Sequence, residues 1–263
     1  MSAAAAVDLP ALARTVQRNC DLADALHARD ASLCTYLLAM REFYRWDTRA
    51  ALGAPLPRAA VGTWIAQREA RWEALRQTAA RFGPLPLAGG IEPFDETAAN
   101  ALLMPAGLVY GAGVGRFGAP LFFLAELAAS ETRDGARVLL LEREHARGLW
   151  APPALARGGT IVVRKEALRR WLWTLIAGAQ RRARADALTL ALRLQPGDAD
   201  GARLEALAER LIESLVLHEL GELRAGALLG SDWEDMRAAL ADRRADLVAR
   251  AVRDLLADAL VTL

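Results

Sequence analysis

Hydrophobic residues recur at every third or fourth position over the first and last thirds of the chain, the spacing of one face of an α-helix. Segments rich in glycine and proline interrupt this pattern at 53–57 and 82–86. The spacing predicts helices at about 9–27, 33–44, 58–81, 167–194, 202–229 and 233–261. Within the second helix, the predicted inner face consists of Leu33, Tyr36, Leu37, Met40, Phe43 and Tyr44.

The middle of the chain has a different pattern, with short apolar runs bounded by glycine and proline. These runs predict strands at 107–113, 119–124, 137–141 and 160–163. Their connections are too short for helical crossovers throughout, so we expect an antiparallel sheet. The segment 111–118 contains G-x-G-x-x-G, but a strand follows it instead of a helix, which favours a hairpin turn over a nucleotide-binding loop.

The predicted fold class is therefore α+β, mainly α, with N-terminal helices, a small central sheet and a C-terminal helical bundle. We expect two domains. Residues 1–165 comprise the N-terminal helices and the sheet, and residues 166–263 comprise the bundle. Loops at 197–201 and 230–232 separate the helices of the bundle.

Composition limits the classes of partner. The chain has 33 basic and 32 acidic residues among 263, so its net charge of +1 provides no general attraction to nucleic acid or to anionic membranes. The densest apolar run, 119–129, is too short to span a bilayer. Two cysteines, Cys20 and Cys34, do not form a disulfide framework, and the first residues lack the charge pattern of a signal peptide. We therefore expect a cytoplasmic protein without nucleic-acid or membrane partners.

Candidate chemistry is concentrated in the run His218-Glu219-Leu220-Gly221-Glu222. It differs by one residue from the H-E-x-x-H motif, in which two imidazoles on one helix face bind zinc and the glutamate activates water. Here Glu222 replaces the second histidine, and a carboxylate is also a metal ligand. The motif predicts His218 and Glu222 as ligands and Glu219 as the catalytic base.

Helical projection places His218 and Glu222 on the same face as a stripe of leucines, with Glu219 beside it. Ionisable groups on a buried face are costly unless they are paired, protonated or bound to a metal. Two interpretations follow: a metal site, or a buried polar network in which the side chains bond to each other or to an arginine. Gly221 within the helix permits the close approach of another backbone or marks a kink.

Additional ligands are needed to complete a metal site. His145 follows a predicted strand, and His27 lies near the end of the first predicted helix. Asp24 and His27 have the i, i+3 spacing used in dimetal proteins, and Glu42 on the next helix offers another carboxylate.

These residues support a first hypothesis, a metal-binding protein that acts as a metal-dependent hydrolase. Its cofactor would be a divalent ion, zinc first and manganese or iron next. The substrate, a small molecule or a peptide, is not identified. The alternative is a non-catalytic helical interaction or scaffold protein with a buried His-Glu network. This alternative predicts a homo-oligomer or a copurifying partner.

Several stretches together resemble an uncharacterised bacterial family of unknown function, over nearly the whole chain. They are N-C-D and L-C-T-Y-L-L-A-M-R-E-F-Y-R-W between Asn19 and Trp46, Y-G-A-G at Tyr110, P-L-F-F-L-A-E-L from Pro120, H-E-L-G-E, and R-D-L-L-A-D-A-L-V-T-L from Arg253. The resemblance implies no activity and no site residue.

Overall fold

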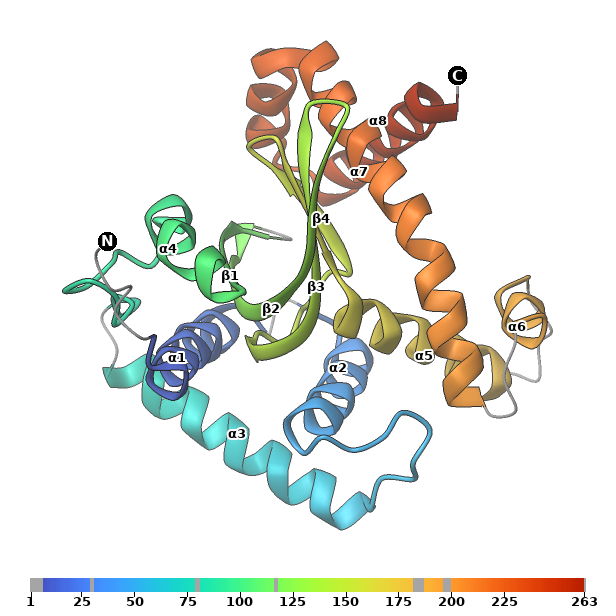
Figure 1. The fold of residues 1–263 in the computed structure, drawn as a ribbon. Coiled ribbons are helices and arrows are strands. Elements are labelled where there is room, and N and C mark those ends of the chain that lie inside the picture. Colours follow the sequence, from blue (N-terminus) through green and yellow to red (C-terminus); the bar gives the residue numbers. More distant parts are fainter. Residues whose placement is uncertain are drawn as a thin grey trace. The chain divides into compact units, whose positions relative to one another are not determined.

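The computed structural model describes residues 7–28, 31–78, 81–115, 118–181, 187–195 and 200–262 (Figure 1). The N-terminal helices are α1 (Leu9–His27), α2 (Leu33–Asp47), α3 (Arg58–Thr78) and α4 (Glu96–Leu103), followed by a 3-10 turn, η2 (Met104–Ala106). The strands are β1 (Leu108–Val114), β2 (Pro120–Arg133), β3 (Ala136–Arg147), β4 (Ala154–Arg157) and β5 (Thr160–Arg164). The C-terminal helices are α5 (Lys165–Arg181), α6 (Ala187–Arg193), α7 (Asp200–Ala239) and α8 (Arg243–Thr262). The predicted class, α+β and mainly α, is confirmed.

The first two helices show how far the hydrophobic pattern predicts packing. The side chain of Asp8 caps α1 by accepting a hydrogen bond from Ala11 N at 3.0 Å. Helix α1 has the predicted bounds. In α2 the predicted inner face is correct only in its second half. Met40 and Phe43 are buried, whereas Leu33 is 71% exposed and Leu37 is 45% exposed. The reason is that the aromatic core around Trp46 and Trp72 is contacted in α2 by Tyr36, Ala39, Met40, Phe43 and Trp46, and not by Leu33 or Leu37.

The sheet has the strand order β1-β2-β3-β5-β4. Strands β1 and β2 pair antiparallel, so the glycine-rich segment joins a hairpin as predicted, and β4 and β5 also pair antiparallel. The sheet as a whole is mixed, which corrects the prediction of a purely antiparallel sheet. Strand β5 lies between β3 and β4 and begins beside the start of β3, where Arg137 N donates to Gly159 O at 2.9 Å. The intervening β4, which the pattern missed, reverses the chain without a crossover helix.

The C-terminal helices break at two places. Gly230 has φ 69° inside α7, which confirms the predicted interruption at 230–232. A second break at 240–242 was not predicted. Asp242 ends it by accepting a hydrogen bond from Ala245 N at 2.8 Å, so α8 begins at Arg243. Residues 182–186 of the predicted helix 167–194, and most of the predicted loop 197–201, lie outside the described residues.

The chain divides into two compact units. Unit 1 comprises 1–128, 141–151 and 173–178, and unit 2 comprises 129–140, 152–172 and 179–263. Each unit has its own core. In unit 1 the core includes Leu12, Val16 and Phe122, whereas in unit 2 Val216 and Leu220 of α7 pack on Ile161 and Val163 of β5. The domain division at 165/166 stays a prediction.

Within the described part of the chain, no helix has both the length and the apolar character that crossing a bilayer requires.

Candidate functional site

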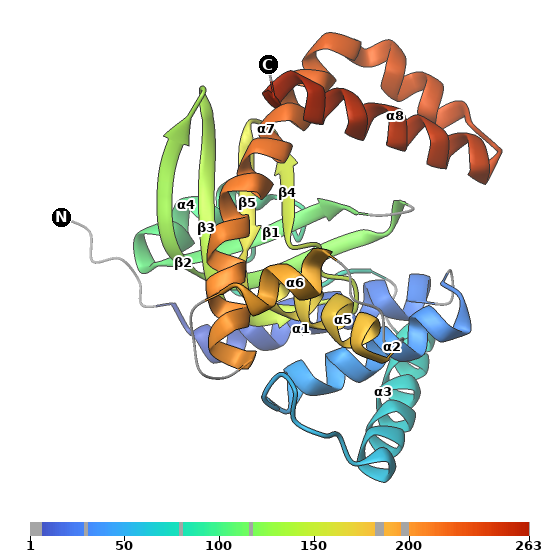
Figure 2. The same cartoon turned by 90° about the vertical axis from the view of Figure 1, so that its right-hand side faces the viewer.

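The C-terminal helices α7 and α8 approach each other closely at Gly221. A Cβ atom at this position would lie 2.2 Å from the carbonyl oxygen of Ala257 in α8, a distance that real Cβ atoms do not show. Gly221 therefore permits the close approach of another backbone, which was one of the two roles expected for it. Figure 2 shows α8 running alongside the final part of α7.

This close approach brings α8 side chains to the predicted metal ligands. The Nδ1 atom of His218 lies 2.7 Å from an Asp258 carboxylate oxygen. Glu222 forms an ion pair with Arg253, with a nitrogen–oxygen distance of 2.5 Å. Both predicted ligands are half-buried and bonded to α8. The arrangement is thus a polar network between two helices.

Glu219, the predicted catalytic base, faces the sheet. Its carboxylate accepts a hydrogen bond from the backbone N–H of Ala156 in β4. Because β4 is the last strand of the sheet, this bond satisfies a donor that an edge strand would otherwise leave exposed. Glu219 therefore joins α7 to the edge of the sheet.

The pKa values of these three groups are all raised. Burial raises the pKa of the Glu219 carboxyl to about 7, against the attraction of protonated His218. Burial also raises the pKa of Glu222, against the neighbouring charge of Arg253. For His218, burial lowers the pKa, but the hydrogen bond to Asp258 and the nearby carboxylates outweigh it, so the pKa rises. Glu219 is therefore the member of the cluster that titrates near neutral pH.

A metal site needs at least three converging ligands. Among the residues described by the structure, no group of three or more His, Cys, Asp or Glu side chains has an arrangement that would hold a metal ion. The predicted roles of His218 and Glu222 as ligands, of Glu219 as the base, and of zinc, manganese or iron as cofactor stay predictions.

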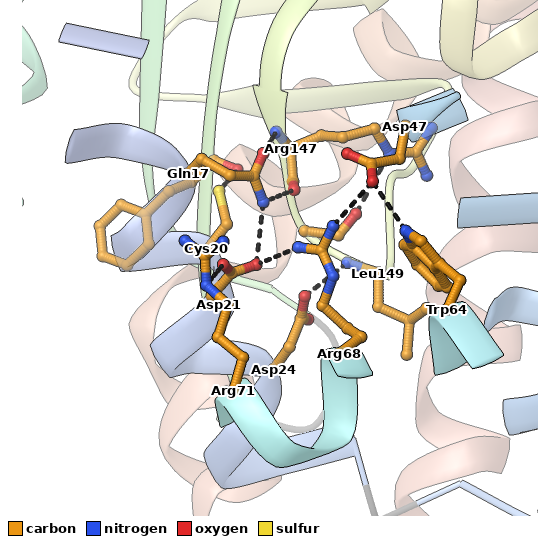
Figure 3. A network of polar contacts seen from close by, with 12 residues as sticks. Gln17, Cys20, Asp21, Asp24, Asp47, Trp64, Arg68, Arg71, Arg147 and Leu149 are labelled. Atoms are coloured by element: carbon orange, nitrogen blue, oxygen red, sulfur yellow. Dashed lines mark hydrogen bonds and ion pairs between the residues drawn. The ribbon is translucent and has the colours of Figure 1, made fainter. Parts of the chain in front are cut away.

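A second polar network lies within unit 1 (Figure 3). Asp21 of α1 is fully buried and pairs with Arg68 of α3 at 2.9 Å and with Arg71 at 3.1 Å. Arg68 also pairs with Asp47, at the end of α2, at 3.2 Å, and its guanidinium lies 4.8 Å from the ring centre of Trp64. One buried arginine thus connects three helices.

The same network ties α1 to the segment after β3. Gln17 donates to the Arg147 carbonyl at 3.0 Å and accepts from Arg147 N at 3.1 Å. Asp24 accepts a hydrogen bond from Leu149 N at 2.8 Å. Burial raises the pKa of Asp24 to about 8, opposed by that hydrogen bond and reinforced by the charge of Asp21. The raised pKa favours the protonated form of Asp24, whose carboxyl oxygen still accepts the hydrogen bond from the backbone.

The other residues considered as additional ligands have separate local surroundings. His145 of β3 lies 2.9 Å from Glu126 of β2, through Nε2 and Oε1. Glu42 pairs with Arg45 at 3.3 Å within α2. His27 is the last residue of α1. Their predicted contribution to a metal site stays a prediction.

Four residues important to these networks were not identified from the sequence: Asp21, Arg68, Arg253 and Asp258. A signal for Arg68 was present, because it lies four residues from both Trp64 and Trp72 and so shares their helix face. For Arg253 and Asp258 the sequence contains no comparable signal, since their roles depend on where α8 crosses α7.

Comparisons with known proteins identify a family. Residues 11–164 match the N-terminal domain model, and residues 169–263 the C-terminal domain model, of a family of unknown function (DUF6866). No curated protein and no solved structure matches the chain. The resemblance to a family without an assigned activity is confirmed.

Proposed function

Because this chain belongs to DUF6866, a family of unknown function, we propose a function from its geometry: it is a non-catalytic helical interaction protein. In this proposal the α7–α8 pair binds an amphipathic helix. The observation that carries the proposal is that α8 has apolar residues on more than one face. In the described part of the chain α7 covers one of these faces, whereas large apolar residues on another are exposed.

The inner face of α8 is occupied by α7. Ala249 and Ala257 are buried, and Ala257 is the residue whose carbonyl contacts Gly221. With about 100° between successive residues, these positions lie on one side of the helix. This face accounts for the packing of α8 in its own unit.

The outer face carries large apolar side chains in contact with solvent. Leu247, Val248, Val252 and Leu255 are between 50% and 69% exposed. Helical projection places Val248, Val252 and Leu255 on the side of α8 away from Ala257, with Leu247 at one edge of this side and Val252 at the other edge, next to Ala249. Isolated exposed leucines are ordinary, but a contiguous stripe along a helix is typical of an interaction surface. We name Leu247, Val248, Val252 and Leu255 the outer stripe.

A groove of about 550 Å³ adjoins the outer stripe. The groove lies between the end of α7 and the first half of α8. Its apolar lining residues are Trp233, Met236, Leu240, Ala245, Val248, Ala249 and Val252, and Asp242 and Arg244 also line it. Val248 and Val252 belong to both the groove and the outer stripe. A helix lying on this surface would insert side chains into the groove, as amphipathic helices do in other helix-binding grooves.

The polar residues have a structural role in this proposal. The pairs His218–Asp258 and Glu222–Arg253 hold α8 against α7. They therefore fix the orientation in which α8 exposes the outer stripe. A divalent cation bound by His218 and Glu222 would have to displace Arg253 from Glu222 and Asp258 from His218 Nδ1, or bind beside these pairs. The existing pairs favour the interaction protein over the metal-dependent hydrolase.

Photocrosslinking in the producing cells tests the proposal. Leu247 is replaced by p-benzoylphenylalanine, and crosslinked peptides are identified by mass spectrometry. We expect adducts with a helical segment of a protein. The same replacement at Leu33, which is 71% exposed in α2, is the matched control and should give none. Equal crosslinking at both sites, or none at Leu247, would overturn the proposal.

Elemental analysis separates this proposal from the hydrolase. Protein purified without chelator should contain far less than one metal ion per chain, and a chelator should leave its melting temperature unchanged. One equivalent of zinc, manganese or iron that is lost in His218→Ala would support the hydrolase instead.

A further inference from the structure

We infer that the amphipathic helix bound by the outer stripe is α8 of a second copy of this chain, lying antiparallel to the first. This inference rests on the proposed function and names its partner. Three features of α8 support it: the spacing of its outer residues, the placement of its charges and the position of the groove.

The spacing suits helix-to-helix packing. Val248, Val252, Leu255 and Ala259 follow one another at intervals of four, three and four residues. This alternation is the seam along which two helices pack side by side, with side chains of one helix inserted between those of the other. All four residues lie on the outer face, so the seam is available to a second helix.

The charges on α8 favour an antiparallel arrangement. Arg244 is exposed near the N-terminal end of the seam, and Asp258 lies near its C-terminal end with 62% of its side chain exposed. This order is opposite to the one that the helix dipole favours, in which acidic residues precede basic ones. In a parallel pair, like charges would meet at both ends. In an antiparallel pair each Arg244 approaches an Asp258 of the other copy, and the two helix dipoles also oppose each other.

One register brings the groove and the charges together. When two antiparallel α8 helices are centred between residues 250 and 251, Leu255 of one copy comes within about one residue of Ala245 of the other, and Arg244 comes within about one residue of Asp258. Ala245 lines the groove, and Leu255 is 69% exposed. The leucine of each copy therefore enters the groove of its partner, and the contact occurs twice. Such a self-complementary surface is what a two-fold dimer requires.

Light scattering after gel filtration tests the dimer on the purified full chain. We expect twice the chain mass of 28.4 kDa. Leu255→Glu should raise the dimer dissociation constant by about 100-fold or more, because a carboxylate would enter an apolar groove. The control is Leu33→Glu, which alters a leucine of matching exposure and should leave the dimer intact. Circular dichroism checks that both variants fold.

Charge exchange tests the antiparallel register. Arg244→Asp alone and Asp258→Arg alone should each weaken the dimer, because each places like charges at both ends of the seam. Mixing the two variants should restore a heterodimer, since opposite charges then meet at both ends. The melting temperature of each variant reports any effect of Asp258→Arg on the pair with His218.

The outcomes separate the two proposals. A monomeric wild-type chain whose Leu247 crosslinks to a helix of another protein would overturn the homodimer and leave the interaction function standing. A dimer that Leu255→Glu does not weaken, or charge variants whose mixture does not associate, would also overturn the inference. Loss of both the dimer and the Leu247 adducts would overturn both proposals.

Discussion

At the scale of single residues, two positions in α7 determine how α8 and the sheet edge attach to it. Gly221 sets the distance between the helices, because any side chain there would occupy the position of the Ala257 carbonyl. Glu219 supplies an acceptor to the edge strand β4 while remaining mostly buried. Each of these roles leads to a separate prediction about stability.

Gly221→Ala should destabilise the protein, although alanine normally favours a helix by about 1 kcal/mol over glycine. The added methyl group would overlap the Ala257 carbonyl and force α8 outward, at a cost of about 1–3 kcal/mol. Gly226→Ala, in the same helix with no atom within 4 Å of its added Cβ, is the control and should stabilise. Urea unfolding of both variants measures the difference. Equal effects at the two positions would show that the close approach has no energetic consequence.

Glu219→Gln should alter the pH dependence of stability. A carboxyl whose pKa rises from 4.5 to about 7 on folding contributes stability that is fully present below pH 4.5 and lost as pH rises through 7. Glutamine keeps an acceptor for Ala156 but does not ionise. The variant should therefore become more stable relative to the wild type between pH 4.5 and 8, as measured by urea unfolding across that range.

Glu213→Gln provides a control of opposite sign for this measurement. The hydrogen bond from Arg133 lowers the pKa of Glu213, so its contribution is present above the unfolded value and lost as pH falls. The difference in unfolding free energy between Glu213→Gln and the wild type should change only at acidic pH, as pH falls below the ordinary value of 4.5. Parallel stability curves for Glu219→Gln and the wild type from pH 4.5 to 8 would contradict the assignment of a buried carboxyl.

At the scale of elements, the N-terminal helices are joined by buried charge as well as by apolar packing. Arg68 on α3 reaches Asp21 on α1 and Asp47 at the end of α2, and its guanidinium lies over the rings of Phe43 and Trp64. Asp21 is fully buried. Arg71 of α3 also pairs with Asp21, so two guanidinium groups hold α3 against α1, and Arg68 is the buried one.

Arg68→Met should destabilise unit 1 by about 1–3 kcal/mol, because the buried Asp21 carboxylate loses its closest partner and keeps only Arg71 and Gln17. The control is Arg76→Met on the same helix. Arg76 pairs with Glu73 near the surface, where an ion pair contributes about 1 kcal/mol or less. Thermal or urea unfolding compares the two. If both variants lose the same small amount, the buried network does not hold the helices together.

At the scale of the whole molecule, the sequence predicted the succession of elements better than their packing. The helix α1, the hairpin of β1 and β2, and the break at Gly230 follow from periodicity and from glycine, which act locally. The exposure of Leu33 and the insertion of β5 beside β3 were not predictable, because each depends on segments distant in the sequence. For the candidate site too, the local pattern was predictable and the distant partners were not. Helical projection predicted that His218 and Glu222 need compensating partners, and it did not identify those partners.

The sequence by itself therefore determined the class of the fold, the family, and a helix face on which ionisable groups must be compensated. Periodicity and residue chemistry contain that information. Only the tertiary structure decided that Asp258 and Arg253 provide the compensation, because an unpredicted break at 240–242 turns α8 back along α7 at Gly221. The same turn leaves Leu247 and Leu255 exposed on the outer face. The run His218–Glu222, which resembles a protease motif in sequence, thus lies at the contact between two helices.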